Sequence, residues 1–142
     1  MTVDGALAPD RIVARPGRLS QRLLWLVPGL AIAFYAGAQA TAYDLGLVPL
    51  LLFSIVPHLT VLLGVGQPHA RGQLPHRAVP LYNVMHHPVP PLALLGLAAA
   101  GILSPFWLVG ALAWLGHIVV DLALGHGLRT PDGWLRQWWS PR

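Results

Sequence analysis

The chain has 142 residues, of which 55% are hydrophobic and only 10% are charged, whereas about a quarter of the residues in soluble domains are charged. Its net charge of +4 comes from arginine alone, because lysine is absent, and none of its five acidic residues is a glutamate. Cysteine is absent as well. These absences exclude a P-loop lysine, a Schiff base, an HExxH zinc helix, disulfides and thiolate metal ligands.

Residues 1–21 form the first predicted region, in which arginines and two aspartates stand among Ala, Pro and Gly without apolar periodicity. We expect a disordered basic tail here. Its positive charge should lie on the cytoplasmic side and attract anionic lipid head groups, while nucleic acid is the weaker alternative as a partner.

Residues 22–129 are predicted to form a single membrane domain. Four apolar segments are expected to span the bilayer, at residues 23–43, 47–64, 79–103 and 105–124. Small residues in the first span would allow close helix packing, namely Ala36, Gly37, Ala38 and Ala40. Cleavage of this first segment as a signal sequence after Ala40 is an open alternative.

Local signals mark the ends of these segments. Asp44 and Gly46 predict a tight turn, Ser104 followed by Pro105 predicts a helix start, and Gly125 predicts a helix end. In residues 130–142, Thr130 as a cap and Trp134 and Trp138 on one face predict a short amphipathic helix at the membrane interface. The predicted fold is therefore all-α, a transmembrane four-helix bundle with a broken third helix and this short interfacial C-terminal helix.

The break in the third span follows from its prolines. Pro88, Pro90 and Pro91 lack the N–H that a helix needs, so the helix must break or kink beside His86 and His87. Broken backbone at membrane depth is tolerated only when it is buried in protein or lines a watery cavity. Such breaks occur at the ion and substrate sites of transporters.

Arginines occupy only alternate connections, namely the N-terminal tail, residues 65–78 and the segment after residue 124. By the positive-inside rule, both termini are then cytoplasmic. At about 1.5 Å of rise per residue, His58, His86, His117 and Asp121 all lie roughly 7 to 13 Å from the cytoplasmic ends of their spans. Three spans thus bring ionisable side chains to one layer.

An ionisable side chain at the centre of a bilayer costs roughly 2.5 kcal/mol or more on insertion scales, so it usually has a partner. His117 and Asp121 are one helical turn apart and can address one point. We therefore take His58, His86, His117 and Asp121 as candidate ligands of zinc or another divalent metal. Three residues are candidate outer-shell partners, namely Tyr82, Asn83 and His87.

Less specific roles are open for individual residues. His58 could simply form a hydrogen bond with Ser54 one turn earlier, and Asp121 could either bind a metal or orient His117. His69 and His76 are expected to be ordinary loop histidines, and His126 is expected to face solvent. No catalytic residue is assigned.

Two motifs resemble a known family. Tyr82-Asn83-x-x-His86 and Trp114-Leu115-Gly116-His117-x-x-x-Asp121-x-x-Leu124-Gly125-x-Gly127-Leu128 are similar to a bacterial family of small integral membrane proteins that is described only as a domain of unknown function. The resemblance covers roughly residues 23–133. It implies a multi-pass protein of the bacterial cytoplasmic (inner) membrane and implies no activity. A more distant similarity, in size and in scattered His and Asp, is to proteins described as membrane-bound metal-dependent hydrolases.

The chain departs from the family pattern at two places. His58 follows Pro57 where Asp is expected, and both side chains can bind a metal. The family's final His-Leu-Gly segment is absent, and Trp138, Trp139 and Ser140 stand in its place.

Several functions are compatible with the polar layer. A metal site could activate water for hydrolysis, or the same residues could relay protons or ions. The residues could also be structural and only hold the spans together. Bis-histidine haem binding is disfavoured, because two spans with paired histidines at haem spacing are not visible. The sequence leaves open whether the protein is an enzyme, and it does not indicate an oligomeric state.

The arginine pattern makes the topology testable. Reporter fusions at Asp44 and Ser104 should report the periplasmic side, and fusions at Arg71 and Arg142 the cytoplasm. A periplasmic signal at Arg71 would contradict both the topology and the common depth of the polar residues.

Overall fold

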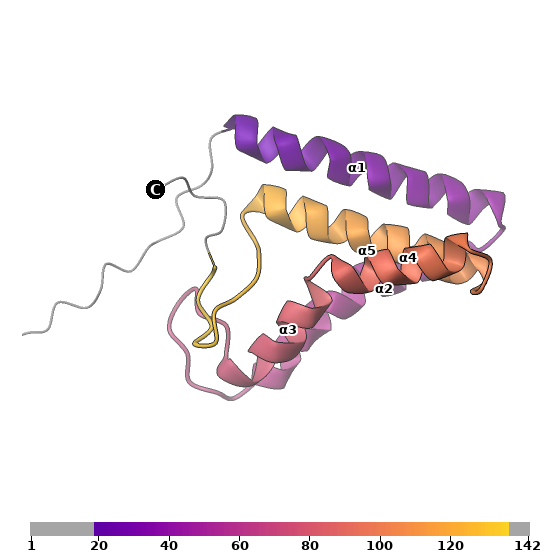
Figure 1. Cartoon of the computed structure of the whole chain (residues 1–142). Coiled ribbons are helices and arrows are strands. Elements are labelled where there is room, and N and C mark those ends of the chain that lie inside the picture. The colour runs from indigo at the N-terminus through magenta and orange to yellow at the C-terminus, as the bar shows by residue number, and fades with distance from the viewer. Residues whose placement is uncertain (1–18, 137–142) are drawn as a thin grey trace, which may run out of the picture.

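A computed structural model of the chain describes residues 19–136, and this part is all-α, as predicted. Its helices are α1 (Leu19–Ala42), α2 (Val48–Leu59), η1 (Thr60–Gly64), η2 (His76–Ala78), α3 (Val79–Met85), α4 (Val89–Ala99) and α5 (Pro105–Leu124). Figure 1 shows α1 running alongside α5, with α2 and α4 on the other side of α5. The predicted disordered tail lies outside the described residues except for its last three, which begin α1.

Two helices in the described part of the chain are long and apolar enough to cross a membrane, namely residues Arg22–Ala42 of α1 and the whole of α5. Pro28 lies inside α1 without ending it. The second predicted span is the shorter apolar run Val48–Gly64, formed by α2 and η1. The third predicted span is divided between α3 and α4.

The contact between α1 and α5 depends on small residues. A Cβ added to Gly29 would lie 2.8 Å from Val120 Cγ2 and 3.1 Å from the Val120 backbone nitrogen. Ala36 and Ala40 are also buried, as predicted for a small-residue face. The prediction was wrong for Gly37 and Ala38, because Gly37 faces open space and Ala38 is exposed. It is Gly29 that allows α1 and α5 to approach each other closely.

The predicted break in the third span is confirmed. α3 ends at Met85, and α4 begins at Val89, directly after Pro88. The break leaves the Met85 carbonyl without the usual N–H four residues later, because the Val89 N–H instead donates to His87 Nδ1 at 3.3 Å. The indole Nε1–H of Trp114, a buried residue of α5, donates to this Met85 carbonyl at 2.6 Å. The break is therefore stabilised from the neighbouring helix.

Helix α5 begins and ends where predicted. Ser104 is its N-cap, Pro105 is its first residue, and Gly125 follows it in the left-handed conformation with φ 84°. Asp44 and Gly46 likewise have positive φ in the turn between α1 and α2. These boundaries follow from residues whose backbone preferences are strong.

The predicted interfacial helix is wrong for the described residues 130–136. They form a turn from Thr130 to Gly133, closed by an isolated bridge between Arg129 and Leu135. Thr130 Oγ1 does accept the Trp134 N–H at 3.1 Å, but a capping side chain can stabilise a turn as well as a helix. Gly133 has φ 88°, which a continuing helix does not allow. Trp138, which was expected on the membrane-facing side of this helix, lies outside the described residues.

The role of Gly29 can be tested against Gly37 on the same helix. Each Gly→Ala replacement gains up to about 1 kcal/mol of helix propensity. At Gly29 the added methyl meets the α5 backbone, and such overpacking typically costs about 1 to 3 kcal/mol. In detergent, Gly29→Ala should therefore lower the thermal midpoint, and Gly37→Ala should leave it unchanged or raise it. Equal effects of the two replacements would contradict the close packing.

Candidate functional site

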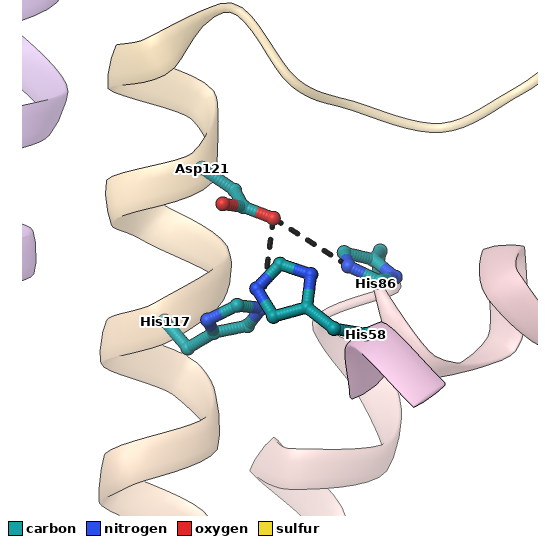
Figure 2. A group of neighbouring side chains, drawn as sticks. All are labelled: His58, His86, His117 and Asp121. Carbon is teal, nitrogen blue, oxygen red and sulfur yellow. Dashed lines mark ion pairs between the residues drawn. The ribbon is translucent and has the colours of Figure 1, made fainter. Parts of the chain in front are cut away.

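Four polar side chains from three parts of the chain meet beside α5. His58 comes from the last turn of α2, His86 directly follows α3, and His117 and Asp121 come from α5. One potential ligand atom from each lies within 4.8 Å of all the others. Figure 2 shows these four side chains pointing toward a common centre. We refer to these four residues as the His/Asp cluster.

The Asp121 carboxylate is the hub of the His/Asp cluster. Its Oδ2 atom lies 3.5 Å from His86 Nε2 and 3.5 Å from His117 Nε2. The side chains of His86, Asp121 and His117 are only 2%, 9% and 10% exposed. His58 is exposed and lies edge-on to His117, with ring centroids 4.5 Å apart. The cluster is therefore buried at His86, His117 and Asp121 and exposed at His58.

Hydrogen bonding determines which nitrogen of His86 carries a proton. Its Nδ1 lies 2.9 Å from the backbone carbonyl of Tyr82, and a carbonyl can only accept a hydrogen bond. Nδ1 must therefore be the protonated nitrogen, and in the neutral ring Nε2 presents a lone pair toward Asp121. The Tyr82 ring stacks on His86 with centroids 3.9 Å apart and so fixes the plane of the imidazole.

Three atoms at the centre of the cluster are buried without a hydrogen-bond partner among the described residues, namely His86 Nε2, His117 Nε2 and Asp121 Oδ2. Buried polar groups are normally paired, and an unpaired one costs about 1 to 3 kcal/mol. A lone pair on His86 Nε2 also faces a carboxylate oxygen at 3.5 Å, an arrangement that favours a positive charge between them. A proton or a cation between His86 Nε2 and Asp121 Oδ2 would therefore stabilise this arrangement.

His126 also contacts this site, although the sequence predicted that it would face solvent. Its Nδ1 lies 3.4 Å from Asp121 Oδ1, the carboxylate oxygen that faces away from His86 and His117. This hydrogen bond raises the pKa of His126 above its usual range. The His126 side chain is still 52% exposed, so it connects the buried carboxylate with the surface.

The sequence did contain a signal for this contact. The His126 N–H donates to the Asp121 carbonyl at 2.8 Å and the Gly125 N–H donates to the Leu122 carbonyl at 3.1 Å. This pair of bonds is the Schellman pattern, in which the residue after the left-handed glycine packs against the residue five positions before it. A glycine at 125 therefore brings the side chains of positions 121 and 126 together.

The three candidate outer-shell residues have different positions. Tyr82 supports His86 through its carbonyl and its ring. The Asn83 side chain pairs with the Arg129 backbone; it accepts the Arg129 N–H at 2.7 Å and donates to the Arg129 carbonyl at 2.9 Å. His87 is exposed and accepts the Val89 N–H within the helix break. Of these three residues, Tyr82 therefore has the contacts with His86 that an outer-shell role would use.

The Asn83–Arg129 clamp holds the segment that follows α5 against α3. Arg129 also lies over the Tyr82 ring, with its guanidinium carbon 5.7 Å from the ring centroid, and donates to the Gly72 carbonyl at 3.1 Å. The Leu74 N–H donates to the Gly133 carbonyl at 2.9 Å, which joins the loop before η2 to the segment that follows α5. These contacts fix the chain on both sides of the His/Asp cluster, at His86 and at His126. His69 is an exposed loop residue, as predicted, and His76 is exposed at the start of η2.

Comparison with known families gives one match. The family described as Domain of unknown function (DUF4260) matches residues 25–136, which include the whole His/Asp cluster and His126. The chain belongs to this family. The resemblance of the motifs around Tyr82–His86 and Trp114–Leu128 to a family of unknown function is thereby confirmed. No curated protein and no solved structure matches the chain.

Proposed function

We propose that this protein is an integral membrane protein that binds a divalent metal ion through His86, His117, Asp121 and His58. One observation carries the proposal: unpartnered, buried ligand atoms from separate helices converge on a single point. The ligand role of each residue and the identity of the metal are part of this proposal. Zinc is the metal that three imidazoles and one carboxylate suit well, because it binds both donor types in four-coordinate sites.

The spacing of the donor atoms supports a small ion. In a tetrahedral zinc site, metal–ligand distances of about 2.0 to 2.1 Å place neighbouring ligand atoms about 3.3 Å apart. Asp121 Oδ2 lies 3.5 Å from His86 Nε2 and 3.5 Å from His117 Nε2, and the potential ligand atoms of all four residues lie within 4.8 Å of one another. A modest movement, mainly of the exposed His58, would complete the coordination.

A membrane location is the second part of the proposal. Residues 22–42 and α5 are long enough to cross a bilayer, and we propose that α2 with η1 and the pair α3 and α4 form two further spans. Large apolar side chains of α1 and α2 are exposed, including Leu24 and Leu51. Exposed apolar surface of this extent is costly in water and normal in lipid. Both termini would be cytoplasmic, because arginine occupies alternate connections.

The exposure of His58 bears on the chemistry that a bound metal could perform. Catalytic zinc sites typically keep one position for water or substrate beside three protein ligands. His86, His117 and Asp121 would supply the three fixed ligands, and a weakly held His58 would leave the fourth position exchangeable. A metal-bound water in that position would be activated for hydrolysis. Hydrolysis is therefore the reaction class that we propose for this site.

Proton transfer is the second candidate function. His126 is half exposed beyond the end of α5, and Asp121 and His117 link it to His58, an exposed residue of α2. This row of ionisable groups could carry protons through the cluster, with a proton in place of the metal between His86 and Asp121. Metal content separates the two candidates, because a relay needs no bound metal.

The first test is metal analysis of the purified protein by mass spectrometry. We expect about one divalent ion per chain after incubation with zinc and removal of free metal. His117→Ala and Asp121→Ala should abolish this binding while the protein remains folded by circular dichroism, and His69→Ala should retain it. Metal that stays bound in the Asp121→Ala variant would contradict the proposed site.

A second test addresses His126. Loss of an outer-shell partner typically weakens metal affinity 10- to 100-fold. His126→Phe should therefore raise the zinc dissociation constant by roughly that factor, because Asp121 loses the hydrogen bond that orients it. His87→Phe is the matched control, since His87 is exposed and makes its side-chain contact within the helix break. Equal affinities of the two variants would show that His126 does not position Asp121.

A further inference from the structure

An apolar pocket of about 160 Å³ adjoins the His/Asp cluster. Trp25 of α1 and Leu115 and Val119 of α5 are among its apolar walls. Three ionisable residues also line it, namely His86, Asp121 and His126, and all three belong to the site described above. The pocket therefore combines an apolar body with a polar region that is shared with the proposed metal site.

We propose that this pocket holds the hydrocarbon chain of an amphiphilic substrate whose polar group reaches the metal. This assignment rests on the proposed function and adds the chemical class of the substrate. It commits to a single-chain amphiphile from the cytoplasmic leaflet, because the orientation, the size and the lining of the pocket each favour such a molecule.

The orientation follows from the position of the pocket along α5. Leu115 precedes Asp121 by six residues, so the pocket extends about 9 Å along the helix from the carboxylate toward the membrane centre. His126 lies beyond the end of α5, on the proposed cytoplasmic side. An amphiphile of the cytoplasmic leaflet has the same orientation, with its polar group outward and its chain inward.

The size and lining favour hydrocarbon over water. A buried water needs two to four polar partners, and an apolar cavity of about 150 Å³ stays dry and can bind benzene. The pocket is of this size, so it can hold about six carbons of a chain. The ionisable side chains that line it, His86, Asp121 and His126, are those that also form the site.

The position of the pocket beside α1 gives a hydrocarbon chain a route into it from the surrounding lipid. Leu23, Leu24 and Val27, which flank Trp25, are exposed apolar residues. One turn later, Gly29 packs tightly against Val120 and closes the contact between α1 and α5. The pocket thus begins next to a surface that faces lipid and ends where the two helices meet.

Straight-chain alkyl hydroxamates of increasing length test the assignment, because their polar group binds divalent metals and their chain can enter the pocket. Binding is measured on zinc-loaded protein in lipid nanodiscs, after the zinc content has been determined. Each buried methylene should strengthen binding about fourfold until the chain reaches roughly six carbons, where the gain should stop. Partition into the bilayer also favours long chains, but it is the same for every variant of the protein.

Leu115→Trp fills the pocket without changing a proposed ligand, and it should remove the protein-specific gain with chain length while acetohydroxamate binds as before. Leu124→Trp is the matched control, because Leu124 is 59% exposed, lies on the same helix and does not line the pocket. The Leu124→Trp variant should show the same dependence of binding on chain length as the wild type. Trp25→Ala enlarges the pocket and should extend the gain to longer chains.

The outcomes separate the two proposals. A wild-type protein without zinc overturns both the metal site and the substrate class. A zinc-loaded protein whose chain-length dependence is the same in the wild type, Leu115→Trp and Trp25→Ala overturns the substrate class alone. If Leu115→Trp does not fold, the comparison of the wild type with Trp25→Ala decides, and an unchanged limit in chain length contradicts the assignment.

Discussion

The burial of one carboxylate dominates this structure. Asp121 is 9% exposed in its side chain and lies on a helix whose other residues are apolar except for His117. Its two oxygens have separate partners, since Oδ1 faces His126 while Oδ2 faces His86 and His117. An ionised carboxylate with this burial requires positive charge or hydrogen-bond donors nearby. The surrounding imidazoles, together with a bound cation in the proposed function, meet that requirement.

Other features of the fold place these partners around Asp121. The prolines after His87 end α3, so that His86 leaves the helix beside α5, and Trp114 pairs with the carbonyl that the break exposes. Gly29 lets α1 approach α5 closely on another side. Gly125 turns the chain back so that His126 reaches the carboxylate. The helix break after α3, the close contact between α1 and α5 and the chain reversal at Gly125 therefore all lie around Asp121.

Much of this arrangement could be predicted from the sequence, because strong local signals determine it. Prolines predicted the break, Ser104-Pro105 and Gly125 predicted the ends of α5, and a common depth predicted that His58, His86, His117 and Asp121 would meet.

Contacts that depend on long-range packing were not predicted from the sequence. Asn83 clamps Arg129 rather than supporting His86, and Gly29 rather than Gly37 faces α5. Residues 130–136 form a turn because Gly133 pairs with Leu74, which is distant in sequence. The Asp121–His126 contact was predictable in principle, since the Schellman pattern follows from Gly125.

The central claim is that a metal ion occupies the centre of the His/Asp cluster, and X-ray absorption at the zinc edge tests it most directly. The account predicts nitrogen and oxygen ligands at about 2.0 to 2.1 Å, together with the outer scattering of about three imidazole rings in the wild type and about two in the His58→Ala variant. A spectrum without imidazole scattering, or one that is the same in His117→Ala as in the wild type, would place the zinc elsewhere and contradict the account.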